Sequence, residues 1–169
     1  MKNIVLTGFM GTGKTEVGRE LSRLLNMKLI DVDAEIEKTK KMTINEIFRR
    51  LGEFQFREFE TEIIKKVTRK KSVIISTGGG AIIREENVDA LRKNGLIICL
   101  TATAETILNR TGNSDDRPLL RADDPLAQIR QLLESRKPFY QRADITIDTE
   151  GKSPRQVAEE IIDRLKGKI

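Results

Sequence analysis

The chain has 169 residues, of which 34% are charged, a length and composition typical of one soluble globular domain with a core of its own. It has no histidine and one cysteine, which excludes a zinc site and an internal disulfide and leaves a carboxylate or a lysine as the only possible general base. The net charge of +5 suits anionic small substrates, whereas one tyrosine, no tryptophan and no apolar run of ~18 residues argue against nucleic-acid and membrane partners.

Short apolar runs alternate with amphipathic stretches along the chain. In chain order, the predicted strands cover residues 3–7, 28–31, 72–77, 96–101 and 144–148. The predicted helices cover about 14–25, 34–41, 43–51, 53–69, 85–93, 104–110, 125–142 and 154–166. This alternation predicts an α/β fold with a mainly parallel sheet. The stretch 111–123 matches no element, and a loop of this length within one domain is usually functional, commonly a lid.

Several predicted helices begin or end at residues that favour such boundaries. Thr43 and Glu46 have the spacing of a capping box, and Gly52 follows as a stop signal. Asp124 and Ser153 are each followed by a proline, the pattern of an N-cap with proline in the first turn. These signals support the predicted helix boundaries.

The segment Gly8-Phe9-Met10-Gly11-Thr12-Gly13-Lys14-Thr15 matches the phosphate-binding pattern G-x-x-x-x-G-K-[ST] and stands between a predicted strand and a predicted helix. Its backbone N–H groups are expected to surround the phosphates of ATP at the helix N-terminus. Lys14 is expected to reach the β- and γ-phosphates, and the Thr15 hydroxyl to bind Mg²⁺. The predicted ATP-binding residues here are Gly11, Thr12, Gly13, Lys14, Thr15 and Glu16.

Asp31 and Asp33 end the second predicted strand and come early enough to face this phosphate loop. The later strands 72–77 and 96–101 end without an acid, and no N-K-x-D motif is present, which weakens the motor ATPase and GTPase interpretations. Because side chains two apart on a strand share a face, we expect one carboxylate to support Mg²⁺ and the other to address the attacking nucleophile. The alternative for Asp33 is the N-cap of the next helix.

Two arginines and a run of glycines are candidates for binding the phosphoryl acceptor. Arg57 lies between two phenylalanines and needs an anion, which is either a ligand or the flanking Glu53 and Glu60. The glycines at 78–80 allow a ligand to approach the backbone closely, although a tight turn would also use one or two of them. Arg136 by itself reads most simply as a surface arginine.

These segments occur in one order and spacing: GFMGTGKT, Asp31-Val32-Asp33, F-x-x-x-G-E-x-x-F-R-x-x-E at 48–60, the glycines at 78–80, Arg117-Pro118-Leu119-Leu120 and Arg136-x-Pro-x-Tyr. In this combination the chain resembles the shikimate kinase family, from residue 4 to about 158. The phosphate loop is widespread among proteins. The segment 48–60 together with Asp33 and Gly79 makes the resemblance specific.

The resemblance implies roles on the acceptor side. Asp33 would bind the shikimate hydroxyls and act as the base at the 3-hydroxyl that accepts the phosphoryl group. Arg57 and Arg136 would hold the substrate carboxylate. The backbone at Gly78, Gly79 and Gly80 would support the ring hydroxyls.

On the nucleotide side, the resemblance implies that Arg117, on the lid, closes over ATP and stabilises charge on the moving phosphoryl group. Arg110 and the stretch Ser153-Pro154-Arg155 would enclose adenine, and Asp31 would hold Mg²⁺ through water. Glu16 departs from the family, which often has a small hydroxyl residue there. We therefore expect its carboxylate to turn away from the nucleotide.

The resemblance also implies a three-layer P-loop kinase fold with a five-stranded parallel sheet in a single domain over 1–169. A helical substrate-binding insert would cover about 33–61 and a mobile lid about 111–124. The implied activity is Mg-ATP-dependent phosphorylation of shikimate at its 3-hydroxyl by a monomer, and the lack of a signal peptide predicts a cytoplasmic location. The alternatives are a gluconate- or nucleotide-type kinase on the same fold, or a non-catalytic ATP-binding module.

Overall fold

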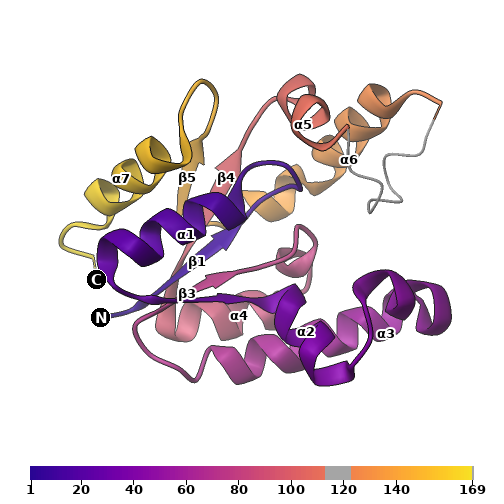
Figure 1. Ribbon diagram of the computed structural model, residues 1–169, viewed down its shortest axis with the longest axis horizontal. Coiled ribbons are helices and arrows are strands. Elements are labelled where there is room, and N and C mark those ends of the chain that lie inside the picture. Colours follow the sequence, from indigo (N-terminus) through magenta and orange to yellow (C-terminus); the bar gives the residue numbers. More distant parts are fainter. Residues whose placement is uncertain (113–122, 169) are drawn as a thin grey trace.

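The computed structural model describes residues 1–112 and 123–168. The described part contains a five-stranded, fully parallel sheet in the order β2-β3-β1-β4-β5 (Figure 1). The strands are β1 (Asn3–Thr7), β2 (Lys28–Asp31), β3 (Val73–Ser76), β4 (Gly95–Thr101) and β5 (Ile145–Asp148). All five predicted strands are confirmed to within one residue at each end, and their parallel order brings all five carboxyl ends to one edge of the sheet.

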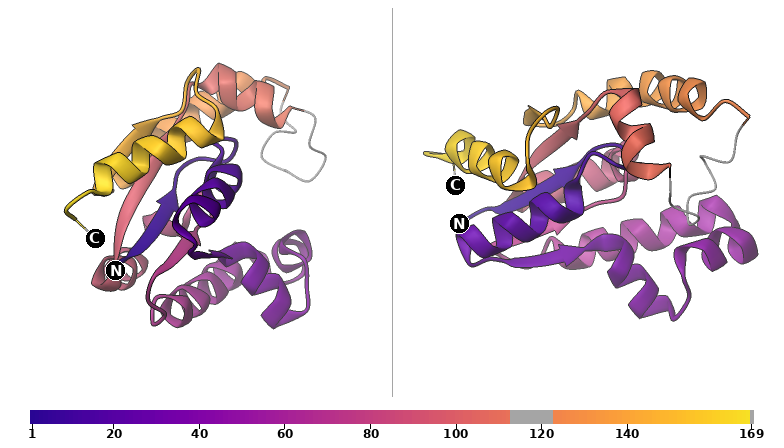
Figure 2. Two further views of the ribbon diagram at one scale, coloured as in Figure 1. Left: turned by 60° about the vertical axis from the view of Figure 1, so that its left-hand side comes forward. Right: turned by 45° about the horizontal axis from the view of Figure 1, so that its top comes forward.

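Helices cover both faces of this sheet and give the three-layer α/β arrangement expected. They are α1 (Lys14–Leu25), α2 (Val32–Lys40), α3 (Ile44–Val67), α4 (Glu85–Asn94), α5 (Ala104–Thr111), α6 (Pro125–Tyr140) and α7 (Pro154–Leu165). A short 3₁₀ turn, η1 (Ala81–Ile83), was not predicted. Figures 1 and 2 show α1 and α7 packed together on one face and α3 and α4 on the other, with α2 and the start of α3 extending beyond the sheet.

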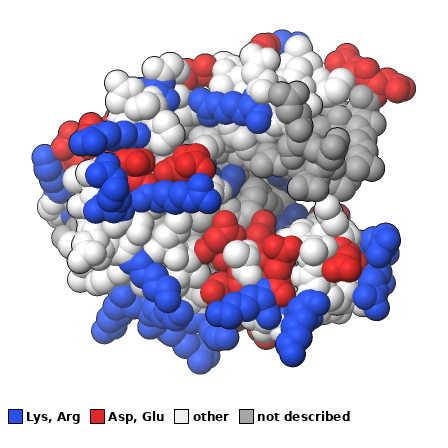
Figure 3. Space-filling model, viewed as in Figure 1, with Lys and Arg blue, Asp and Glu red and all other residues white. Residues whose placement is uncertain are grey.

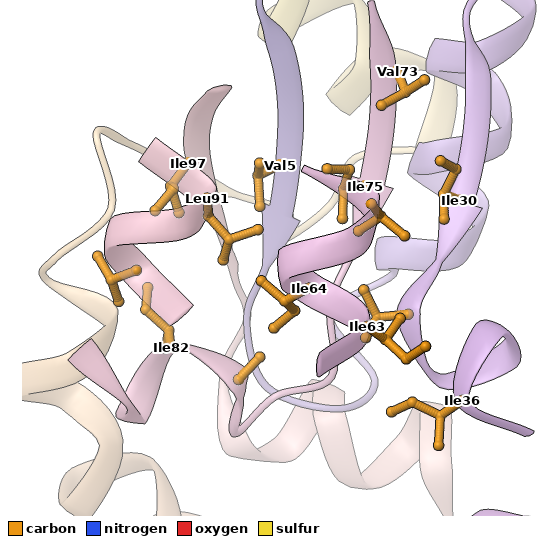
Figure 4. Close-up of a cluster of buried hydrophobic side chains, with 14 of the residues drawn as sticks. Val5, Ile30, Ile36, Ile63, Ile64, Val73, Ile75, Ile82, Leu91 and Ile97 are labelled. Carbon is orange, nitrogen blue, oxygen red and sulfur yellow. The ribbon is translucent and has the colours of Figure 1, made fainter. Parts of the chain in front are cut away.

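Alternate side chains of the central strands β1, β3 and β4 enter two separate cores. Val5 and Ile75 point toward α3 and α4, where they meet Ile63, Ile64 and Leu91 (Figure 4). The neighbouring residues of the same strands point to the opposite face and pack against α1 and α7. Because both faces of these central strands are covered, their sequences are nearly continuous apolar runs, whereas the edge strand β5 alternates buried and exposed residues.

The predicted helix boundaries are confirmed where capping residues were recognised. Thr43 and Glu46 form a reciprocal capping box, and Asp124 and Ser153 accept hydrogen bonds from the first turns of α6 and α7. Gly52, with φ 83°, breaks α3 into two helical halves, as its position as a stop signal predicted.

The face shown in Figure 3 carries side chains of both charges, with acidic residues gathered over α2. Among the described residues, no helix combines the length and the apolar character that a membrane crossing requires.

Candidate active site

The phosphate loop connects β1 to α1 and has the backbone shape that its sequence predicts. Gly11 and Gly13 have φ of 77° and 92°, in the region that favours glycine. Gly13 is the N-cap of α1 and has no capping side chain, so the first amide groups of the helix point toward the loop. A helix N-terminus of this kind attracts a phosphate group.

Lys14 lies over this loop. Its ammonium donates hydrogen bonds of 2.7 Å and 2.9 Å to the carbonyl oxygens of Gly8 and Phe9. Thr12 is buried and donates to the same Phe9 oxygen at 2.7 Å, which ties the loop together. Thr15 is exposed, and the carboxylate of Glu16 pairs with Arg19 at 2.6 Å.

The expectation that Asp31 and Asp33 share one face of a strand is wrong. Strand β2 ends at Asp31, and α2 begins at Val32, so Asp33 belongs to the first turn of the helix. The capping role considered for Asp33 falls to Asp31, whose Oδ1 accepts a hydrogen bond of 3.0 Å from the Ala34 amide. The physical reason is that the chain turns into the helix directly at the strand end, with Asp31 in the extended conformation that an N-cap needs.

Asp33 is half-buried, and its Oδ1 atom is buried without a hydrogen-bond partner. Burial, reinforced by the charges of Asp31 and Glu60, raises its pKa to about 6, and the cations Lys14 and Arg57 oppose this shift. At neutral pH the side chain is therefore mostly ionised but weakly stabilised. This is the state required of a general base.

The ion pairs considered for Arg57 are confirmed. Its guanidinium pairs with Glu60 at 2.8 Å and with Glu53 at 3.6 Å, and its side chain is only 16% exposed. The Arg57 side chain also lies close to the glycine turn. A Cβ added to Gly80 would be 2.7 Å from Arg57 Cζ. Glu60 is fully buried, and burial raises its pKa despite Arg57.

The three glycines after β3 form the point where the site residues meet. A Cβ on Gly78 would lie 3.3 Å from an oxygen of both Asp33 and Glu60, and one on Gly79 would lie 3.2 Å from Arg136 Nη1. Gly80 has φ −96°, which any residue adopts, so its backbone conformation does not require glycine, but a Cβ there would displace the Arg57 guanidinium.

Arg136 is half-buried and belongs to this arrangement rather than to the open surface. It extends from α6, and its Cζ lies 5.3 Å from the centroid of the Phe9 ring in the phosphate loop. Gly79 also lies against the loop, since a Cβ there would be 3.2 Å from the Gly8 carbonyl oxygen. Arg57, Arg136, Asp33 and the phosphate loop therefore surround one turn of the chain.

On the other side of the phosphate loop, a cavity of about 190 Å³ is lined by residues that include Thr12, Gly13, Arg110, Thr149, Lys152 and Pro154. Arg110 reaches across it and donates to the Gly11 carbonyl at 3.1 Å and to the Thr149 hydroxyl at 3.3 Å.

Of the residues predicted to enclose adenine, Arg110 and Pro154 line this cavity. Ser153 instead caps α7, and Arg155 pairs with Glu159 at 2.9 Å on the surface. Arg117, predicted on the lid, lies outside the described residues.

The model of the shikimate kinase family matches residues 10–166. The chain belongs to the shikimate kinase family. The shikimate kinase of Thermodesulfovibrio yellowstonii is 49% identical to it over 162 residues, covering 96% of this chain and 94% of that protein. The solved shikimate kinase from Acinetobacter baumannii, in complex with shikimate, matches with a TM-score of 0.94 and 38% identity over 100% of this chain and 96% of that one. A gluconokinase from Sinorhizobium meliloti, at 13% identity and a TM-score of 0.60 over 98% of this chain and 91% of that one, shares the fold alone.

In this member of the shikimate kinase family, the structure also places at the site some residues to which the sequence gives no role there. The sequence predicts Glu60 only as an ion-pair partner of Arg57, although its place at the end of the 48–60 pattern is a usable signal. Phe9, at a variable position of the phosphate pattern, and Thr149, just after β5, gave no comparable signal. Tyr140 closes the Arg136-x-Pro-x-Tyr segment and contacts Gly79.

Proposed function

We propose that the chain transfers the γ-phosphoryl group of ATP to the 3-hydroxyl of shikimate, giving shikimate 3-phosphate and ADP. The observation that carries this proposal is the meeting of Asp33, Arg57 and Arg136 at the Gly78–Gly80 turn beside the phosphate loop. The family relative solved with shikimate supports the choice of acceptor.

Arg57 and Arg136 bind the acceptor carboxylate, because guanidinium groups match a carboxylate in shape and charge. The backbone of Gly78, Gly79 and Gly80 supports the ring hydroxyls from below. The segment 33–61, made of α2 and the first half of α3, is the acceptor-binding part of one domain that spans 1–169.

Asp33 acts on the reacting hydroxyl. As the bond forms between the acceptor oxygen and the γ-phosphorus, the bond from that phosphorus to the β,γ-bridging oxygen breaks, and the hydroxyl proton passes to Asp33. The transfer is loose and the proton leaves late, so a base with a pKa of about 6 is sufficient. Lys14 exchanges its bonds to the Gly8 and Phe9 carbonyls for phosphate oxygens when ATP binds.

The oxygen donors near the phosphates fit Mg²⁺. Thr15 offers a hydroxyl, and Asp31, one of whose oxygens caps α2, offers a carboxylate that can hold the ion through water. Within the described residues, no group of three or more His, Cys, Asp or Glu side chains could hold a metal by itself, which suits an ion that binds mainly to phosphates and water. When bound, Mg²⁺ offsets the charge of the phosphates.

The remaining assignments belong to the same proposal. Arg110 and Pro154 contact the adenosine part of ATP, with Ser153 and Arg155 close by, and Arg117 acts on the transferring phosphoryl group. ATP and shikimate are the partners of a monomer with no nucleic-acid or membrane partner, and the enzyme works in the cytoplasm, where ATP is supplied.

An ADP-release assay with Mg-ATP tests the proposal. The acceptors are shikimate, gluconate, several nucleoside monophosphates and none. ADP release that depends on shikimate alone is the expected result. Release with another acceptor would contradict the substrate, and release with no acceptor present, at an equal rate, would contradict the kinase assignment. Chelation of Mg²⁺ with EDTA should abolish the release, and added Mg²⁺ should restore it.

Arg57→Ala should raise the KM for shikimate by about 30-fold or more, since a charge-assisted bidentate contact to the carboxylate is lost. The KM for ATP should stay within about threefold, because the ion pairs of Arg57 are with Glu53 and Glu60 and not with groups of the phosphate loop. Steady-state kinetics with each substrate varied in turn measure both constants.

Two further variants accompany this measurement. Arg84→Ala removes an arginine that also pairs with α3, through Glu58, and should leave both constants unchanged. Arg57→Lys keeps a cation beside the buried Glu60 and controls for folding. If Arg57→Ala binds shikimate as well as the wild type does, the ion pair with Glu60 is the whole role of this arginine.

A further inference from the structure

Tyr140, the last residue of α6, lies next to the glycine turn of the proposed acceptor site. Its half-buried ring packs against the core on the α3–α4 face of the sheet and against a smaller cluster that includes Phe9 and Ile129. Its hydroxyl donates a hydrogen bond of 3.0 Å to the carbonyl oxygen of Gly79, 61 residues away in the chain. The end of α6 is thereby tied to the glycine turn.

Arg136 faces the same hydroxyl. It precedes Tyr140 by about one helical turn, so the two side chains leave the same side of α6. Burial raises the pKa of the Tyr140 phenol to about 12, and the charge of Arg136 and its hydrogen bond to the phenol lower it. The hydroxyl thus remains protonated near neutral pH and can donate to Gly79 while it accepts from Arg136.

The guanidinium of Arg136 is held from a second direction by the Phe9 ring, 5.3 Å from Cζ. Gly79 contacts both side chains. A Cβ added to it would lie 3.2 Å from Arg136 Nη1 and 3.5 Å from the Tyr140 hydroxyl. A long arginine side chain loses much rotamer freedom when it binds a ligand, and contacts that order it beforehand reduce that loss.

We propose that Tyr140 is a positioning residue for the acceptor, whose hydroxyl orients Arg136 toward the acceptor carboxylate and holds the Gly79 carbonyl beneath it. This rests on the proposed function and adds to it a residue that acts through Arg136 and Gly79. Loss of the Tyr140 hydroxyl should weaken the binding of shikimate rather than that of ATP. The hydroxyl bonds to Gly79, and Tyr140 is not among the residues that line the Arg110 cavity.

Tyr140→Phe tests the proposal, because it removes one oxygen atom and keeps the ring. In the full chain, the KM for shikimate should rise about five- to twentyfold, in line with the loss of one or two hydrogen bonds that order a binding group. The KM for ATP and kcat should stay within about twofold. Calorimetric titration of the nucleotide-free protein with shikimate should show the same rise in Kd.

Phe139→Leu is the matched control, since Phe139 precedes Tyr140 and packs on the same core while its ring contacts Arg142. It should leave both KM values unchanged. A wild-type shikimate KM in Tyr140→Phe would overturn the inference, as would an equal rise in both KM values accompanied by a lowered Tm. If the wild type itself releases no ADP with shikimate, the proposed function fails and this inference fails with it; if it does, the Tyr140→Phe result judges this inference alone.

Discussion

Asp33→Asn should lower kcat by about 10²- to 10⁴-fold while the protein remains folded, because the amide cannot take the proton of the attacking hydroxyl. The KM for ATP should change little, since the proposed partner of Asp33 is the acceptor hydroxyl and not the nucleotide. Single-turnover measurements with ATP and shikimate separate this loss in the chemical step from any change in product release.

The same substitution should stabilise the protein at neutral pH. The pKa of Asp33 rises from 3.8 in an unperturbed carboxyl to about 6 in the fold, so the ionised form is disfavoured in the folded state. Such a shift corresponds to about 3 kcal/mol of lost stability. This loss of stability grows as the pH rises from 3.8 to about 6 and is complete above pH 6. The Tm of Asp33→Asn should therefore exceed that of the wild type most above pH 6 and equal it below pH 3.8.

Wild-type activity should follow the same ionisation. The value of kcat/KM for shikimate should fall as the pH drops below about 6, because protonated Asp33 cannot act as a base. Glu35→Gln is the control, since it removes a carboxylate from the same first turn of α2 and should keep both kcat and the pH profile. Near-normal turnover of Asp33→Asn would show that Asp33 is not the base.

Lys14→Ala should reduce kcat/KM for ATP by about 10³-fold or more, because a cation placed at the transferring phosphate stabilises the charge of the transition state. The ammonium already lies over the loop, bonded to the Gly8 and Phe9 carbonyls. Losing these bonds should also lower the free energy of unfolding by about 1–2 kcal/mol. ADP release and thermal unfolding measure the two effects.

Arg23→Ala is the matched control for Lys14→Ala. Arg23 belongs to the last turn of the same helix, α1, and its side chain is 56% exposed and paired with Glu20. Its removal should leave turnover unchanged. Activity of Lys14→Ala within tenfold of the wild type would rule out the proposed contact to the phosphates.

The sequence alone determined the features that depend on a few consecutive residues. The phosphate loop is one, because its glycines, Lys14 and Thr15 lie within eight positions whose backbone conformation is set locally. The capped helix ends are another, because Thr43 and Ser153 bond to amides three residues ahead. Strand–helix alternation predicted the parallel sheet for a similar reason, since it is a repeated local pattern.

The strand order, and with it the composition of the site, was decided by tertiary structure. Strand β3 lies between β2 and β1, which sets Gly78–Gly80 beside both Asp33 and the phosphate loop. Only this packing shows that Arg136 contacts Phe9, and that Arg57 pairs with Glu60 while it lies against Gly80. Likewise, the raised pKa of Asp33 comes from burial and from the charges of Asp31 and Glu60, and burial depends on how the whole chain packs. Contacts between residues far apart in the chain follow from the packing of both cores, so no local pattern could have predicted them.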